Sequence, residues 1–313
     1  MNTTPEPPVP APPVPAPLVT VIIATYQSAT TLQCALQSVL AQTLTNFEVW
    51  VIGDACTDHS EQEVAAFQDP RVHWYNRSIN SRSQSAPNND GLERARGQYI
   101  AYIGHDDLWF PWHLEGMVQK LEDTGAFLVH ALMIALGPSG VLAVAGVPCK
   151  GWDYDRQLLP PAGWLHRKDD QRWPLEGALV CAPDQDFQRH AFRSGKAIVL
   201  HGDTSVLKFT SSTWRAYSRT SGHPQPSLLQ QMQTDPHGLQ RQLLLQVSLL
   251  QARDHLAIRP IWRLLRSQVY RRLIVGICHM AGASTDMDWR TRFTRSIFQY
   301  LRRKTRPMRG LTN

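Results

Sequence analysis

Between Leu18 and Leu136, short runs of β-branched and aromatic residues alternate with segments of helical periodicity. This alternation is typical of parallel strands, because each crossover between parallel strands needs a long connection that is usually a helix. The predicted strands are 19–23, 47–52, 72–75 and 99–103, and helices are predicted after the first strand and near 89–96. The pattern predicts an α/β fold with a mostly parallel sheet flanked by helices.

Acidic residues directly follow two of the predicted strands. Asp54 comes after the second strand, and Asp106 and Asp107 come after the fourth. Ligands of open α/β sheets bind beyond the carboxyl ends of the strands, which is where these side chains are expected. Neither a Gly-x-Gly-x-x-Gly turn nor a Gly-Lys-Ser/Thr loop is present. A nucleotide bound here would therefore need another device for its diphosphate, such as a divalent cation held by carboxylates.

Four segments of the chain resemble, in order and spacing, successive blocks of glycosyltransferase family 2. The segments are 19–27, 51–58, 91–97 and 102–109. The resemblance covers roughly residues 18–209 and implies a GT-A-type, Rossmann-like fold. It also implies an inverting transfer of a sugar from a nucleoside diphosphate sugar to a hydroxyl of a glycan or lipid-linked acceptor. Two acids that are usual in the family are replaced here, by Gly53 and Gly104.

The resemblance also implies roles for individual residues. Asp106 is the expected ligand of a Mg²⁺ or Mn²⁺ ion, with Asp107 as a second metal residue and His105 in support. Hard oxygen ligands suit these ions, which neutralise the charge on a leaving diphosphate. The residues expected to bind the nucleotide sugar are Thr25, Tyr26, Asp54, Asn89 and Asp106.

Each of these acidic residues also has an ordinary structural interpretation. Asp54 and Asp58 can form Asx turns after a strand. Asp106 or Asp107 can cap a helix that begins near Leu108 and runs through Leu121. These alternatives stay open at the level of the sequence.

An inverting transfer needs a general base to accept the proton of the attacking hydroxyl. In the family this base belongs to an acidic pair well downstream, and residues 182–187 hold the corresponding place here, before a predicted helix and a strand at 196–200. Asp184 is the first candidate and Asp186 is the reserve, because Pro183 stands where the family has a preceding Glu. A carboxylate that stabilises the N-terminus of a helix is the competing interpretation.

Two further predictions concern the middle of the chain. Trp164 and His166 occupy the place of an acceptor-facing segment in related enzymes and are predicted to contact the acceptor. The uncharged run from Phe127 to Pro148 is long enough to span a membrane, but a Gly/Pro turn at 137–140 interrupts it. Two short strands joined by a turn explain this run better, so a buried hairpin is predicted.

The ends of the chain differ in composition from its middle. Residues 1–17 are rich in Pro and are predicted as a disordered leader, followed by a GT-A domain at 18–215 and a basic helical extension at 216–313. Residues 241–313 hold fifteen Lys and Arg and three Asp, and Trp289, Phe293, Ile297 and Leu301 form an apolar stripe. Such a helix suits an anionic membrane surface, while packing on the GT-A domain is the alternative. Nucleic acid is not expected, because no recognition motif is present.

The five cysteines are scattered without paired spacing, and the leader lacks the apolar stretch of a signal peptide. We therefore expect a cytoplasmic protein with a peripheral contact to the cytoplasmic face of the membrane. Two other functions stay open. One is a noncatalytic sugar- or membrane-binding module derived from a transferase, suggested by Gly53 and Gly104. The other is a sugar nucleotidyltransferase, although its Gly-rich first loop is not visible.

Overall fold

The computed structural model of this chain describes residues 16–137, 140–147, 154–155, 159–175, 181–209 and 224–266, with side chains through residue 252. The described residues up to Leu250 form one compact unit. Nearly all of the predicted leader and the whole apolar stripe at 289–301 lie outside the described residues. No helix within the described ranges is both long and apolar enough to cross a bilayer.

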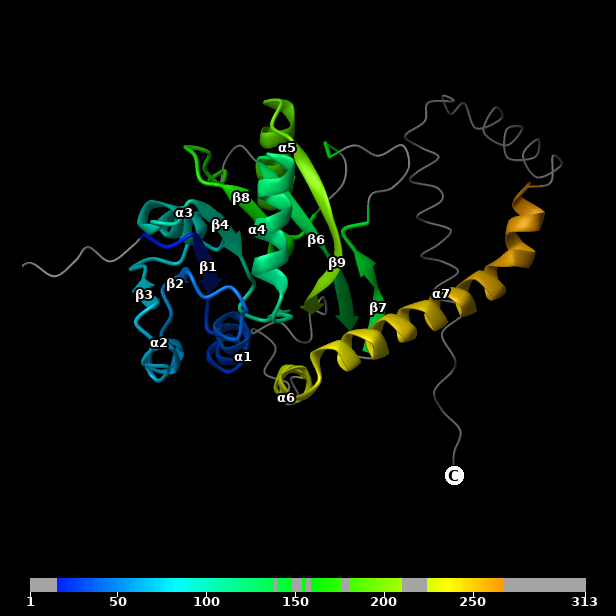
Figure 1. The fold of residues 1–313 in the computed structure, drawn as a ribbon, viewed down its shortest axis with the longest axis horizontal. Coiled ribbons are helices and arrows are strands. Elements are labelled where there is room, and N and C mark those ends of the chain that lie inside the picture. Colours follow the sequence, from blue (N-terminus) through cyan, green and yellow to red (C-terminus); the bar gives the residue numbers. More distant parts are fainter. Residues whose placement is uncertain are drawn as a thin grey trace, which may run out of the picture. The chain divides into compact units, whose positions relative to one another are not determined.

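The described strands form a nine-stranded sheet in the order β3-β2-β1-β4-β8-β6-β9-β5, with β7 paired to β6 (Figure 1). The strands are β1 (Val19–Thr25), β2 (Phe47–Gly53), β3 (Val72–Asn76), β4 (Tyr99–Tyr102), β5 (Leu108–Trp109), β6 (Leu128–Gly137), β7 (Gly140–Ala145), β8 (Trp164–Arg167) and β9 (Ile198–Phe209). The helices are α1 (Ala29–Leu40), α2 (Ser60–Ala65), α3 (Ser85–Arg94), α4 (His113–Thr124), α5 (Pro183–Arg193), α6 (Gln225–Thr234) and α7 (Pro236–Arg266), with a 3₁₀ turn η1 (Pro161–Gly163).

The sheet is parallel in its first half and mixed in its second. Strands β3, β2, β1 and β4 are parallel to one another, and Ile22 of β1 lies between Trp50 of β2 and Tyr102 of β4. Strands β6 and β9 are also parallel, but β8 runs antiparallel between β4 and β6, and β5 runs antiparallel to β9. The α/β prediction is confirmed, and the mixed half results from the short strands β8 and β5, which do not enter the sheet through a helical crossover.

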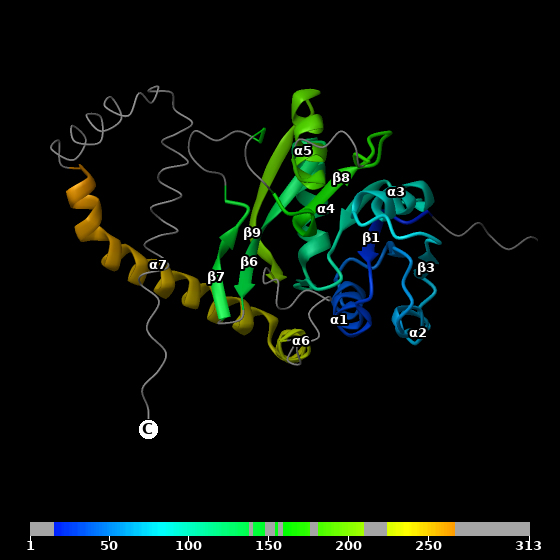
Figure 2. The same ribbon diagram turned by 180° about the vertical axis from the view of Figure 1, so that it is seen from behind.

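Helices cover both faces of this sheet (Figures 1 and 2). Alternate residues of β1 divide between the faces, since Val21 and Ile23 belong to one buried cluster and Ile22 belongs to another. The first cluster includes apolar residues of α1 and α4, and the second includes residues of α3 and α5. This period of two is the expected pattern of a strand that is covered on both sides.

Two sequence predictions in this region need correction. The hairpin exists, but only β6 is buried; among the described strands β7 pairs with β6 alone, and Leu142 of β7 is 47% exposed. The proposed helix from Leu108 is also wrong. Leu108 and Trp109 form β5, paired with Leu207 and Val206 of β9, and α4 begins only at His113. Neither Asp106 nor Asp107 therefore caps that helix.

Helix α6 and the part of helix α7 up to Leu250 belong to the same compact unit, beyond the predicted domain boundary at 215. Leu229 and Met232 of α6, with Leu239, Leu243 and Val247 of α7, are buried in a cluster with residues of β5, β6 and β9. The side-chain amide of Gln225 in α6 donates to the backbone carbonyl of Asp106 at 3.1 Å. Helix α6 therefore holds the loop after β4 through this hydrogen bond.

Candidate active site

Two adjoining cavities lie at the carboxyl ends of β1, β2 and β4, where the fold predicts a ligand. The first has a volume of about 620 Å³ and the second about 660 Å³. The wall that they share is made by Ala24, Arg82, Ser83, Gln84 and His105. Thr25, Tyr26 and Asp54 line the first cavity, and Asp106 and Asp107 line the second. The tertiary structure thus joins the loops after three separate strands in one elongated site.

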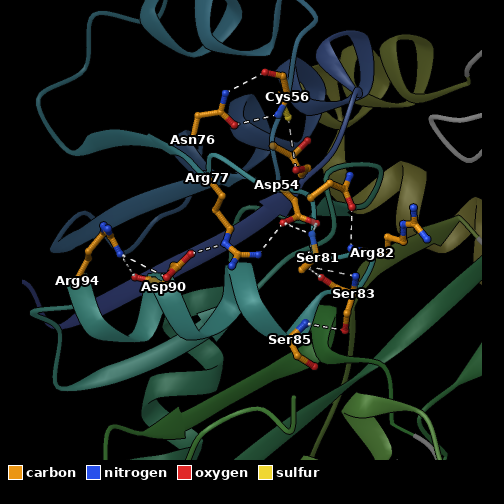
Figure 3. Close-up of polar contacts among 12 residues, drawn as sticks. Asp54, Cys56, Asn76, Arg77, Ser81, Arg82, Ser83, Ser85, Asp90 and Arg94 are labelled. Carbon is orange, nitrogen blue, oxygen red and sulfur yellow. Dashed lines mark hydrogen bonds and ion pairs between the residues drawn. The ribbon is translucent and has the colours of Figure 1, made fainter. Parts of the chain in front are cut away.

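Asp54 is the centre of a polar network beside the first cavity (Figure 3). Its carboxylate accepts hydrogen bonds from the Ser81 backbone N–H at 2.9 Å and the Ser81 hydroxyl at 2.9 Å. Arg77 bridges two acids, with Nη1 at 2.8 Å from Asp54 and Nε at 2.7 Å from Asp90. Both oxygens of this nearly buried carboxylate are occupied. Asp54 therefore fixes the loop that forms one wall of the cavity.

Three residues with left-handed backbone lie in or next to the segments that line the first cavity. Gln27, Ala55 and Arg82 have φ values of 49°, 63° and 58°, in the left-handed region that non-glycine residues seldom adopt. Gln27 also links two loops, since its side-chain carbonyl accepts from the Thr57 and Asp58 backbone N–H groups at 2.9 and 3.0 Å. Such strain persists where surrounding contacts enforce it, and it is concentrated at functional loops.

Gly53 has no space for the acid that the family pattern usually has there. A Cβ atom at this position would lie 2.6 Å from Asn76 Oδ1 and 2.8 Å from the ring of Trp74. Asn76 is fixed there by two hydrogen bonds of 2.9 Å to the backbone N–H and carbonyl of Cys56. The amide of Asn76 therefore occupies the place of the missing side chain and holds the turn after β2.

Gly104, at the second cavity, likewise has no space for the acid that the family usually has there. A Cβ atom there would lie 2.6 Å from Asp107 Oδ2 and 2.9 Å from Asp106 Oδ1, so both carboxylates converge on this glycine. Asp107 is fully buried, and its oxygens accept from Lys208 Nζ at 2.7 Å and from the Phe209 backbone N–H at 3.2 Å. Burial raises the pKa of Asp107 to about 6, against the lowering effect of the Lys208 charge.

The two candidate bases lie on different sides of α5. Asp184 follows Pro183, which lines the second cavity, and the positive charge of Lys208 acts on it. Burial raises the pKa of Asp184, although the backbone N–H of Gln185, at 2.9 Å, favours the charged form. Asp186 lines a separate cavity of about 270 Å³. The geometry therefore favours Asp184 over Asp186 as the group that meets a ligand of the second cavity.

Three sequence predictions about ligand contacts disagree with the structure. Trp164 and His166 are fully buried in β8, so the prediction that they contact an acceptor is wrong. They pack instead in an aromatic cluster with Tyr102, whose hydroxyl lies 3.1 Å from His166 Nε2. Asn89 does not line either cavity, because its amide forms two hydrogen bonds, of 2.8 and 2.9 Å, with the backbone of Trp173. Its neighbour on α3, Asn88, lines the second cavity instead.

Two cationic residues at the site were not predicted from the sequence. Arg82 lines both cavities from a loop without regular structure, and Lys208 reaches the second cavity from β9. No local pattern marks either residue, and Lys208 lies 101 positions from its partner Asp107. His105, predicted only in support, also borders both cavities.

Comparison with known proteins identifies this part of the chain. Residues 20–138 match the family model described as Glycosyl transferase family 2. These residues form a family 2 glycosyltransferase domain. The predicted resemblance is thereby confirmed for the segment that carries Asp54 and Asp106.

Relatives of this family 2 domain include an uncharacterized glycosyltransferase of Rickettsia felis, which is 34% identical over 206 residues. That match covers 60% of this chain and 33% of the relative, so the chain spans about a third of the relative's length. A second relative is UDP-Glc:alpha-D-GlcNAc-diphosphoundecaprenol beta-1,3-glucosyltransferase WfgD of Escherichia coli. It is 27% identical over 170 residues, and the match covers 49% of this chain and 67% of WfgD.

A solved structure extends the likeness beyond the family 2 segment. The mannosyltransferase PcManGT from Pyrobaculum calidifontis, in complex with GDP-Man and Mn²⁺, superposes with a TM-score of 0.51 at 17% identity. The match covers 82% of this chain and 83% of PcManGT. At this identity the comparison supports the fold, which is of the GT-A type.

Proposed function

We propose that this chain is an inverting glycosyltransferase that moves a sugar from a nucleoside diphosphate sugar to a hydroxyl group of a glycan or lipid-linked acceptor. The observation that carries the proposal is the pair of adjoining cavities, with Asp54 beside one and Asp106 beside the other. An elongated donor fits this arrangement, with its base in the first cavity, its diphosphate near the shared wall and its sugar in the second.

The base end of the donor would lie against Thr25, Tyr26 and Asp54. Because both oxygens of Asp54 already accept hydrogen bonds, a direct bond from the base requires Ser81 to give up part of its contact. Asp54 would then exchange one N–H donor for another at little net cost. The nucleoside is a uridine or guanosine by analogy with WfgD and PcManGT, whose names specify UDP-Glc and GDP-Man.

A divalent ion fits the second cavity if the donor supplies most of its ligands. No group of three or more His, Cys, Asp and Glu side chains within the described ranges is arranged to hold a metal alone. Mg²⁺ is commonly held by one or two carboxylates together with substrate phosphates, and Asp106 suits this role. Asp107 is occupied by Lys208 and Phe209, so it would support the site without direct contact. When bound, the ion neutralises charge that develops on the leaving diphosphate.

Asp184 would act as the general base. Its carboxylate accepts the proton of the acceptor hydroxyl as that oxygen forms a bond to the anomeric carbon of the sugar. The bond from this carbon to the diphosphate breaks on the opposite side, and its electron pair leaves with the phosphate oxygen. One displacement of this kind inverts the configuration of the anomeric carbon. Burial favours the task, because it raises the pKa of Asp184 toward the working pH.

The acceptor and the location of the protein are further parts of the proposal. The name of WfgD specifies an acceptor on diphosphoundecaprenol, which supports a lipid-linked acceptor here. Residues 288–309 combine an apolar stripe with a strong excess of Arg. They would hold the protein peripherally on anionic lipid at the cytoplasmic face of the membrane, close to such an acceptor.

A panel of nucleotide sugars tests the function directly. The chain should show a rise in Tm with one class of UDP- or GDP-sugar, and a slow hydrolysis of that donor in the presence of Mn²⁺. Asp106→Asn should lower this turnover at least about 100-fold with an unchanged Tm, because it removes the main protein charge on the metal. Asp123→Asn, at an exposed position of α4, is the matched control. Binding of a donor without any turnover would instead indicate a noncatalytic module.

A further inference from the structure

Lys208 is the least expected charge at the second cavity. It lies on β9, and its ammonium group is 2.7 Å from Oδ2 of Asp107. Both residues border the second cavity, but the side chain of Lys208 is 24% exposed whereas that of Asp107 is fully buried. The ion pair thereby holds Lys208 at the wall of the second cavity.

The charges around the cavity suggest what this ammonium group does. The Lys208–Asp107 pair is neutral as a unit, so Asp106 is the one acid of the 104–107 segment that remains to bind a metal. Gly104 replaces a further acid, and the oxygens of Asp106 and Asp107 fill the space where its side chain would lie. A single carboxylate holds a divalent ion weakly, and a diphosphate in this cavity still needs positive charge.

We propose that Lys208 binds the diphosphate of the donor directly and supplies part of the positive charge that stabilises the leaving group. This inference rests on the proposed function, because it assigns a residue to the diphosphate end of the same site. An ammonium group has three donors, so it can keep its bond to Asp107 while it donates to a phosphate oxygen. Lys208 stays protonated throughout, and the electron pair of the broken bond remains on the phosphate.

The competing role for Lys208 is neutralisation of Asp107 alone. A simple Lys208→Met variant does not separate the two roles, because it leaves a buried carboxylate without a partner and can unfold the protein. The informative pair is Asp107→Asn and the double variant Asp107→Asn/Lys208→Met. In the first variant the ammonium group stays in the cavity, and in the second both charges are removed together. Lys208→Arg keeps the charge and the ion pair.

The measurement is the preference for a nucleoside diphosphate over its monophosphate, determined by calorimetry with UDP and UMP and with GDP and GMP, in Mg²⁺ and in EDTA. The parent chain should prefer UDP or GDP in both conditions, because Lys208 acts without a metal. In EDTA, the double variant should lose about tenfold of this preference relative to Asp107→Asn, equivalent to about 1.4 kcal/mol. Lys208→Arg should keep the preference. Lys196→Met, at a lysine paired with Asp169 beside another cavity, is the matched control and should also keep it.

The possible failures are distinct. An equal preference in Asp107→Asn and the double variant, or a parent chain without any preference in EDTA, would overturn the role of Lys208 and leave the proposed function intact. A parent chain that binds neither UDP nor GDP in Mg²⁺ would overturn the proposed function and the role of Lys208 with it.

Discussion

Single residues at the site combine structural and chemical demands. Gly53 shows this most clearly, since its Cα hydrogen faces the amide of Asn76 and the ring of Trp74 where a side chain would collide with both. Asn76 cannot retreat without losing its two hydrogen bonds to Cys56, which fix the turn that carries Asp54. The site therefore has the hydrogen-bonded amide of Asn76 where a side chain at position 53 would lie, although Asn76 itself is exposed.

Gly53→Ala should destabilise the fold by about 1–3 kcal/mol, because the added methyl group overpacks a region that has little freedom to move. The effect is measured as the free energy of unfolding in urea. Gly202→Ala is the matched control, since a Cβ atom at Gly202 meets nothing within 4 Å. Equal stabilities of the two variants would show that the side chains of Asn76 and Trp74 can move to accommodate the added methyl group, and would contradict this prediction.

The proposed general base, Asp184, can also be tested with single substitutions. Asp184→Asn should lower kcat by about 10²- to 10⁴-fold and leave donor binding unchanged, because proton abstraction occurs only in the chemical step. Asp186→Asn is the matched control, since Asp186 lines another cavity. If Asp186→Asn gives the large loss and Asp184→Asn does not, the assignment within α5 is wrong by two residues.

The same carboxylate predicts a pH dependence. Asp184 accepts a proton only when it is ionised, so kcat should fall as the pH is lowered through its pKa in the folded enzyme. Burial raises this pKa, which moves the acidic limb of the profile above the value expected for an exposed aspartate, about 3.9. A pH profile of kcat under saturating donor and acceptor tests this. An acidic limb at or below that value would contradict the assignment.

At the scale of elements, α6 and the first turns of α7 pack on the sheet that carries the site. Leu243 of α7 is 5% exposed and packs beside β5, β6 and β9, whereas Leu245, two positions along the same helix, is 60% exposed. The first turns of α7 therefore present one apolar face to the sheet, in the manner of an amphipathic helix. Through α6, the same layer contacts the loop of Asp106.

Leu243→Ala should lower the free energy of unfolding by about 2–5 kcal/mol, because it leaves a cavity in a packed core. Leu245→Ala is the same substitution at an exposed position and should lower the free energy of unfolding by less than about 0.5 kcal/mol. Denaturant unfolding of both variants measures the difference. Similar small effects would mean that α7 contributes little to the compact unit.

For the whole molecule, the uneven distribution of charge is the main property that the site does not explain. The last seventy-three residues hold fifteen basic and three acidic residues, while the chain as a whole has a formal charge of +6. The remainder is therefore acidic, and an anionic membrane would attract one end of the chain more than the other.

Full-length protein should bind anionic vesicles, and the binding should weaken as salt rises above physiological strength, where the screening length is about 8 Å. A chain that ends before Asp288 should bind much less, because it lacks the stripe and seven of the fourteen arginines of residues 241–313. Co-sedimentation with vesicles that contain or lack anionic lipid measures both effects. Equal binding by the truncated chain, or none by the full chain, would contradict the membrane role.

Local sequence alone determined the first half of the fold. Strands β1, β2, β3 and β4 were predictable because runs such as Val19–Ile23 combine β propensity with burial on both sides, and the acids that follow them mark the ligand edge. The family resemblance added the identity of the site at Asp54 and Asp106. These features depend on residues that are near each other in the sequence, where propensity and pattern are informative.

Only the tertiary structure decided the rest. The pairing of Lys208 with Asp107, the burial of Trp164 and His166, and the crowding at Gly53 all depend on residues brought together from distant strands. The sequence predicted Asn89 at the ligand site, but its neighbour Asn88 lines the second cavity, since neighbouring helix residues point in different directions. Local pattern has no information on such contacts, because side-chain orientation and long-range packing are fixed only when the sheet assembles.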